Sequence, residues 1–203
     1  MAKSQGTSAY RVASSVSTEK YLHRFQYWRE GLKTLNAPQI LRLFESLNQE
    51  LAQRAVRGEV YLVGGAVMCL VFQAREATKD IDALLVPAAE LRRAAQTVAR
   101  NEGLPDNWLN DAVKGFLSEN GDFDIFEELS HLRVYVPHPG YLLAMKCLAM
   151  RLSEEFQDAD HTRVLLRALN LKTMAEAETI LARYYALDRY PARARYVLEE
   201  LLA

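Results

Sequence analysis

The sequence predicts an α/β (α+β) fold, in which a small mixed sheet has helices before it and a helical segment after it. Short β-rich runs alternate with helical runs between residues 58 and 138, helical spacing precedes them in residues 1–57, and every run in residues 139–203 is helical. Half of the 203 residues are apolar, which is enough for a sizeable core. We therefore divide the chain into an N-terminal arm with helices (1–57), an α/β core (58–138) and a C-terminal helical segment (139–203).

The N-terminal part begins with a polar stretch, residues 1–17, that is typical of a flexible arm. Helices are expected near 18–34 and at 38–56. The second helix is the clearer one because its apolar residues recur at helical spacing: Ile40, Leu41, Phe44, Leu47, Leu51 and Ala55.

The core is expected to start with a strand in "EVYLV" (59–63) and a buried helix in "AVMCLVFQ", directly after a glycine pair. A second strand, "IDALLV" (81–86), stops at Pro87. The run "AAELRRAAQTVARNEG" then predicts an amphipathic helix that ends at Gly103. The order up to this point is βαβα.

The second half of the chain starts with "PDNWLNDAVKGFL", which predicts a capped helix, and continues with "DFDIFEEL" and "LRVYV", which predict two strands. The run "PGYLLAMKCLAMRLSEEF" predicts one long helix. The rest is helical, with a capping box from Thr173 to Glu176 and a last helix that starts on Pro191.

Composition narrows the class of protein. Cys69 and Cys147 both lie in apolar helical runs, so we expect them in the core rather than in a disulfide framework or a zinc site. No apolar run approaches the roughly 20 residues of a membrane helix, and residues 1–17 lack the hydrophobic stretch of a signal peptide. We expect a cytoplasmic protein with no membrane partner.

The net charge of -1 conceals an uneven distribution. Residues 1–57 carry nine Lys/Arg against four Asp/Glu, whereas residues 58–150 carry eight against thirteen. A polyanionic acceptor such as RNA would be attracted by the first part and repelled by the second. The candidate contacts are Lys20, Arg24, Arg29, Lys33, Arg42 and Arg54. The alternative is that these side chains are the solvated faces of two amphipathic helices.

The glycine pair Gly64-Gly65 ends the first predicted strand. A strand that turns into a helix within two residues needs backbone angles and clearances that glycine allows most easily. The unpaired N–H groups at the start of that helix would then suit phosphate oxygens. A plain tight turn is the alternative interpretation.

Asp80 and Asp82 lie two residues apart at the start of the second predicted strand. Side chains at i and i+2 of a strand point to the same face, so two like charges meet on an otherwise apolar strand. A cation between them would relieve their repulsion, and Mg²⁺ (or Mn²⁺) takes one or two carboxylates together with substrate phosphates. The alternative is a solvent-exposed strand start.

The combination of Gly-Gly after a strand and Asp-Ile-Asp on the next strand resembles the nucleotidyltransferase superfamily of DNA polymerase β. The longer run from Gly64 to Asp82, which includes Arg75, Thr78 and Lys79, is similar to small prokaryotic nucleotidyltransferase-like proteins related to AbiEii-type toxins. The resemblance covers about residues 58–190. It implies the nucleotidyltransferase fold, and it makes the glycines and these three side chains candidates for nucleotide binding.

A second stretch, "YLLAMKCLAMRL", supports the resemblance. Lys146 lies on a helix that is apolar nearly all round, so its ammonium needs an anion or a route to the surface. Lys146 and Arg151 match the basic positions of the AbiEii-type pattern, which implies that Lys146 contacts the triphosphate. Lys146→Met is expected to keep or raise thermal stability, because a costly charge leaves a mostly apolar environment, and to weaken triphosphate binding.

The run "FQDADH" follows that helix and brings Asp158 and Asp160, with His161 at the place of a further aspartate in the AbiEii-type pattern. The resemblance implies that Asp158 or Asp160 acts as a base or orients the site. The alternative is a solvated helix face.

A third metal-binding carboxylate is expected from a later strand, where Asp122, Asp124 and Glu127 are available, and alternation favours Asp124. The run "NWLNDAVKGF" also recurs in the resembling proteins and contains Trp108, Asn110, Asp111 and Lys114. Trp108 either stacks on a base or anchors the packing of its element.

These observations together predict a magnesium-dependent enzyme that moves a nucleoside monophosphate from NTP to a hydroxyl of RNA, protein or a small molecule. Two alternatives stay open. The chain could be a non-catalytic module that binds a nucleotide, a nucleic acid or a cognate protein. It could also act with a partner toxin or antitoxin.

Overall fold

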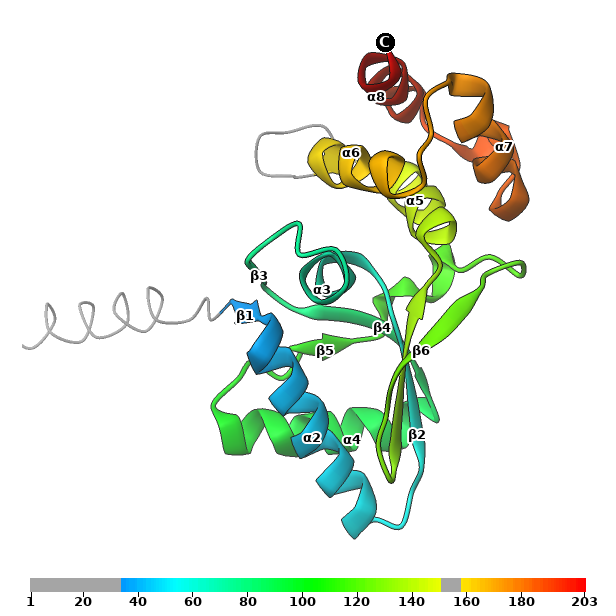
Figure 1. The fold of residues 1–203 in the computed structure, drawn as a ribbon. Coiled ribbons are helices and arrows are strands. Elements are labelled where there is room, and N and C mark those ends of the chain that lie inside the picture. Colours follow the sequence, from blue (N-terminus) through cyan, green and yellow to red (C-terminus); the bar gives the residue numbers. More distant parts are fainter. Residues whose placement is uncertain (1–33, 151–157) are drawn as a thin grey trace, which may run out of the picture. The chain divides into compact units, whose positions relative to one another are not determined.

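Seven α-helices and two sheets make up the described part of the chain, residues 34–150 and 158–203, in a computed structural model (Figure 1). Residues Thr34–Ala203 belong to one compact unit. The predicted arm, the helix expected near 18–34 and Arg151 lie outside the described residues. The predicted α/β class with a mixed sheet is confirmed.

The main sheet is mixed and has five strands in the order β5-β4-β2-β7-β6. These strands are β2 (Gly58–Leu62), β4 (Ile81–Val86), β5 (Leu109–Asn110), β6 (Phe123–Glu128) and β7 (Leu132–Pro137). Strand β2 pairs antiparallel with β4 and parallel with β7. A second, two-residue pairing joins β1 (Leu35–Asn36) to β3 (Ala77–Thr78), and the sequence analysis did not predict it.

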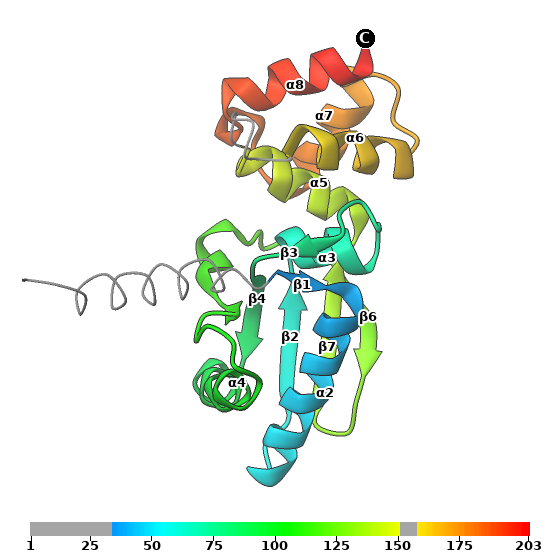
Figure 2. The same ribbon diagram turned by 90° about the vertical axis from the view of Figure 1, so that its left-hand side faces the viewer.

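Helices α2 (Ala37–Gln53) and α4 (Ala88–Glu102) lie on one face of the main sheet (Figure 2). Alternate residues of the strands, such as Val60 and Ala83, are fully buried on that face. Helix α2 presents its apolar stripe there, namely Ile40, Leu43, Phe44, Leu47 and Leu51. The structure therefore joins α2 to the α/β core, although we had grouped it with the N-terminal arm.

The segment after α4 differs from the predicted helix. Residues Leu109–Asn110 form β5, which pairs parallel with β4, and Ala112–Phe116 form the short 3₁₀ helix η1. Trp108 is 1% exposed, and its indole Nε1 donates a hydrogen bond to the carbonyl of Ala95 at 3.0 Å. Strand pairing and this buried indole outweigh the local helical pattern. Trp108 is a packing anchor and is not available to stack on a base.

Helix α5 (Pro139–Leu148) is shorter than predicted, because it ends at Leu148 rather than continuing to residue 156. Helices α6 (Asp158–Ala168), α7 (Met174–Tyr184) and α8 (Ala192–Leu202) follow, with the 3₁₀ turn η2 (Leu187–Arg189) before α8. The predicted capping box at Thr173 and Glu176 is confirmed.

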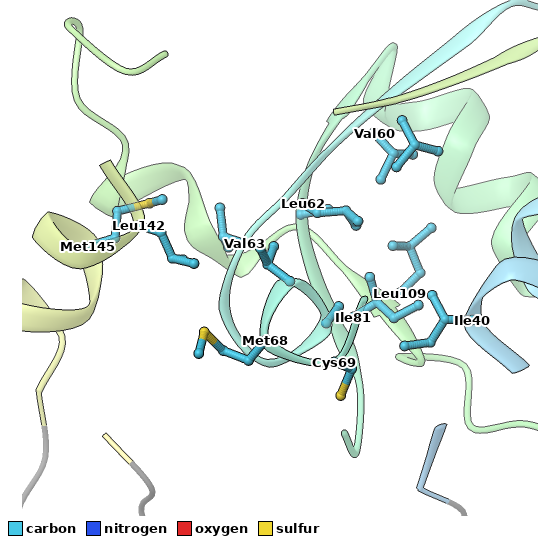
Figure 3. Close-up of a cluster of buried hydrophobic side chains, with 14 of the residues drawn as sticks. Ile40, Val60, Leu62, Val63, Met68, Cys69, Ile81, Leu109, Leu142 and Met145 are labelled. Atoms are coloured by element: carbon cyan, nitrogen blue, oxygen red, sulfur yellow. The ribbon is translucent and has the colours of Figure 1, made fainter. Parts of the chain in front are cut away.

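Helices α5 to α8 lie together beyond the end of the sheet at which β2 finishes (Figures 1 and 2). Leu142 and Met145 of α5 point toward Val63, the residue that follows β2 (Figure 3). Both belong to the same buried cluster as the strand residues, so the helical segment shares its core with the sheet. Cys69 and Cys147 are buried in this cluster, as predicted.

Candidate nucleotide-binding site

A cavity of about 560 Å³ lies where the sheet end, η1 and the helical segment meet. A pocket of this size is within the range of small-molecule sites. It is lined by Val63, Gly64, Asp82, Val113, Phe116, Leu142, Met145, Lys146, Leu148, Ala149, Asp158 and Arg193.

Four residues singled out in the sequence line this cavity together: Gly64, Asp82, Lys146 and Asp158. They come from α3 (Gly64–Leu70), β4, α5 and α6. The cavity thus brings a carboxylate from the sheet and an ion pair from the helices into one space.

Neighbouring side chains lie so close to positions 64 and 65 that only glycine fits there without strain. Gly64 has a φ of +66°, and a Cβ there would lie 3.1 Å from Oδ2 of Asp82. A Cβ on Gly65 would lie 2.5 Å from Oγ1 of Thr78 and 2.9 Å from Nη1 of Arg75. The glycines allow Asp82, Thr78 and Arg75 to approach the start of α3.

Gly65→Ala should therefore destabilise the fold, because the new methyl group must displace the buried Thr78 side chain. Overpacking of this kind costs about 1–3 kcal/mol. Chemical denaturation of the parent and the variant measures this loss. Gly115→Ala is the matched control, since a Cβ at Gly115 meets nothing within 4 Å. Equal stability of the two variants would show that the contact at Gly65 is relaxed at little cost.

Asp80 and Asp82 are both half-buried at the start of β4. Burial, and next the charge of Asp82, raise the pKa of Asp80 above its ordinary value, although Arg75 and Lys79 oppose this shift. The side chain of Asn110 on β5 donates a hydrogen bond from Nδ2 to Oδ2 of Asp80, at 3.5 Å. The two carboxylates therefore repel one another, as the sequence analysis expected.

The segment before Asp80 holds the other residues expected to bind the nucleotide. Arg75 donates from Nε to the carbonyl of Ala77 at 2.7 Å, and Thr78 donates from Oγ1 to the carbonyl of Asp80 at 3.1 Å. Lys79 is exposed. None of these three side chains lines the cavity, and Arg75 and Thr78 bond to the backbone of the segment that leads into β4.

Lys146 and Asp158 form an ion pair across α5 and α6, with Nζ 3.2 Å from Oδ1. The two side chains are 14% and 12% exposed, so the pair is largely shielded from water. This contact supplies the anion that the apolar surroundings of Lys146 led us to expect. Asp158 therefore orients the lysine at the wall of the cavity.

His161 follows Asp158 on α6 and is 2% exposed. Neither of its ring nitrogens has a hydrogen-bond partner within the described part of the chain. Burial lowers the pKa of His161 to about 4, and the positive charges of Lys146 and Arg75 add to this shift. The imidazole is neutral at pH 7 and packs beside the charged end of the cavity.

The lowered pKa of His161 predicts a loss of stability in acid. In the unfolded chain a histidine takes up a proton near pH 6.5, whereas in the folded chain His161 does so near pH 4. Between these values the unfolded state binds more protons, so the free energy of unfolding falls as the pH falls, by up to about 3 kcal/mol. Denaturant titrations from pH 7.5 to pH 4 should show a shallower slope for His161→Gln. A slope for His161→Gln equal to that of the parent would contradict the prediction.

Asp124 lies away from the aspartate pair. In the sheet, Asp124 of β6 pairs with Val136 of β7. Val134, which lies on the same face of β7 as Val136, pairs with Val60 of β2. The side chain of Val60 lies on the face that α2 and α4 cover. By alternation, Asp124 shares that face whereas Asp82 lies on the other. The structure does not bring Asp124 to the proposed metal-binding carboxylates; its Oδ2 is 3.0 Å from Nε2 of His138.

Asp160 also lies outside the cavity. Its exposed carboxylate pairs with Arg163 one turn further along α6. This placement agrees with the alternative of a solvated helix face.

Eight of the twelve described residues that line the cavity are not among the predicted site residues, and they include Val113, Phe116 and Arg193. Val113 and Phe116 come from η1, and Arg193 comes from the first turn of α8. No pattern in the sequence identifies Phe116 or Arg193 as a residue of the cavity wall.

Asp111 holds η1 against α4, since its Oδ2 lies 2.6 Å from Nη2 of Arg92 and 3.0 Å from Nζ of Lys114. These contacts lower the pKa of Asp111 to about 2.

No group of three or more His, Cys, Asp or Glu side chains that could hold a metal ion occurs in residues 34–150 and 158–203. Asp80 and Asp82 still offer the hard oxygen donors that Mg²⁺ prefers, for an ion that completes its coordination shell with water and phosphate oxygens.

In residues 34–150 and 158–203, no helix is long and apolar enough to cross a membrane. No protein-family model, no curated protein and no solved structure matches this chain.

Proposed function

We propose that this chain is a magnesium-dependent nucleotidyltransferase that moves a nucleoside monophosphate from NTP to an acceptor hydroxyl. One observation carries the proposal: Gly64, Asp82, Lys146 and Asp158, selected from separate stretches of the sequence, line a single cavity. Its volume of about 560 Å³ suits a nucleotide.

The cations of the cavity would bind the triphosphate. Lys146 offers an ammonium held in place by Asp158, and Arg193 offers a guanidinium that forms no ion pair with any described residue. An arginine fork suits phosphate oxygens in a bidentate arrangement. Arg193 and Lys146 would thus hold the polyanion from the helical side.

Asp82 of β4 lines the cavity, and Asp80 comes directly before β4, close enough for the charge of Asp82 to act on it. Together they would hold Mg²⁺ (or Mn²⁺), which when bound to the nucleotide neutralises charge on its phosphates. In the transfer itself, the acceptor oxygen bonds to the α-phosphorus, the bond from that phosphorus to the β-phosphate oxygen breaks, and the acceptor proton passes to solvent.

The direct test is to incubate the full chain with each α-labelled NTP, Mg²⁺ and a pool of RNA and protein. We expect label to appear on an acceptor and pyrophosphate to be released in equal amount. RNA, protein and small-molecule acceptors are separated by nuclease and protease treatment of the product. A toxin–antitoxin role would show as loss of transfer when the product of a neighbouring gene is added. Absence of both NTP binding and transfer would overturn the proposal.

A second candidate is a non-catalytic module that keeps the fold to bind a nucleotide or a partner. The observation in its favour is that the described residues place no third carboxylate beside Asp80 and Asp82. Such a module would bind Mg-NTP without releasing pyrophosphate. Equilibrium binding and pyrophosphate release, measured on one preparation, separate the two candidates.

A further inference from the structure

The cavity has two chemically different kinds of wall. Asp82, Lys146, Asp158 and Arg193 supply charge. The remaining lining is almost wholly apolar: Val63, Val113, Phe116, Leu142, Met145, Leu148 and Ala149. A nucleotide has the same division, because a flat aromatic base is joined through a sugar to a polyanion.

Phe116 is the aromatic side chain of the described cavity wall, and it is 48% exposed. Most other phenylalanine rings in a fold of this size pack into the core, as Phe44 does at 0% exposure. About half of the Phe116 surface is therefore exposed, at a residue that lines the cavity. An aromatic face of this kind stacks on any base, because every base has a π-face.

The backbone that presents Phe116 is held by the helical segment. The hydroxyl of Tyr185 donates a hydrogen bond to the carbonyl of Phe116. Two residues later, the backbone N–H of Ser118 donates to the hydroxyl of Tyr141 at 2.8 Å, and the Ser118 hydroxyl donates to the carbonyl of Tyr184 at 2.6 Å. These bonds fix the loop before a ligand arrives, so little ordering cost remains for binding.

We propose that Phe116 is the stacking platform for the base of the bound nucleoside triphosphate, with Val113 beside it, while the triphosphate faces Lys146 and Arg193. This inference rests on the proposed function, because it takes the occupant of the cavity to be a nucleotide. Stacking is tolerant of base identity but grows with ring area. The site should therefore bind ATP and GTP more tightly than CTP and UTP.

The test compares dissociation constants of the four NTPs and of inorganic tripolyphosphate, each with Mg²⁺, by calorimetry on the full chain. Phe116→Ala should weaken ATP and GTP binding about tenfold, in line with the effect of removing one base–aromatic stack. The same variant should bind tripolyphosphate as the parent does. Phe116→Tyr, which keeps the ring, should restore NTP binding. Ile125→Ala, at a site 54% exposed on β6 and outside the cavity wall, is the control and should change nothing.

The possible results separate this inference from the proposed function. If the parent binds neither NTP nor tripolyphosphate, both fail. If the parent binds NTP and Phe116→Ala keeps the same ratio of NTP to tripolyphosphate affinity, only the base platform is overturned. An equal loss for NTP and tripolyphosphate in Phe116→Ala would also overturn it, since Phe116 would then support the pocket rather than the base.

Discussion

Replacing Asp80 and Asp82 together by Asn should lower nucleotide transfer by about a thousandfold, because the charges that would hold the metal and orient the phosphates are removed. The fold should not suffer. Burial and the neighbouring charge already raise the pKa of Asp80, so removing both charges relieves repulsion in the folded state. We expect an unchanged or slightly higher melting temperature for the double variant. Transfer is measured from pyrophosphate release, and stability from thermal unfolding.

A readout independent of activity strengthens this test. Mg²⁺ together with a non-hydrolysable NTP should raise the melting temperature of the parent and leave that of the double variant unchanged. Asp160→Asn is the matched control, because Asp160 lies on an exposed face of α6 and pairs with Arg163. If the Asp80/Asp82 variant responds to Mg-NTP as the parent does, the metal site is elsewhere.

Lys146→Met should abolish most triphosphate binding and should also destabilise the fold. Taken alone in an apolar helix, the lysine predicts that its replacement keeps or raises stability. The structure adds Asp158 at 3.2 Å, and the substitution removes the ammonium that balances this shielded carboxylate. Since the pair is intermediate between surface and fully buried pairs, we expect a loss of about 2 kcal/mol in the free energy of unfolding.

A second substitution, Asp158→Asn, identifies the cause of the lost stability. In Lys146→Met with Asp158→Asn, the carboxylate that faced the lysine is neutral as well, so most of the lost stability should return while NTP binding stays weak. Arg195→Met breaks an exposed pair with Glu199 and should leave unfolding unchanged. Stability that does not return in the double variant would show that Lys146 acts through its packing rather than through the ion pair.

Much of the fold was predictable because local physical rules set it. Short β-rich runs that stop at Gly64 and Pro87 located β2 and β4, and helical spacing located α2 and α4. The capping box at Thr173 fixed the start of α7. Such signals depend on residues within one or two turns of each other, so the sequence contains them in full.

The wrong predictions occurred where distant contacts outweighed local preference. A helix is predicted over residues 105–117, yet Trp108 is buried against α4, Leu109–Asn110 pair with β4, and only Ala112–Phe116 are helical, as a 3₁₀ turn. The contacts of Trp108 and of β5 join residues that are distant in sequence. Helix α5 also stops at Leu148, although its apolar run continues past that residue.

The sequence by itself determined the fold class, the glycine pair, the aspartate pair and the lysine in an apolar helix. Only the tertiary structure decided which of these residues share a space. Asp82 and Lys146 are brought to one cavity because α5 packs over the end of the sheet, whereas the register of β6 turns Asp124 to the opposite face. Phe116 and Arg193 join the cavity through contacts across the fold that no local pattern encodes. Spacing specifies the direction of a side chain relative to its own element, and packing between elements specifies which side chains it meets.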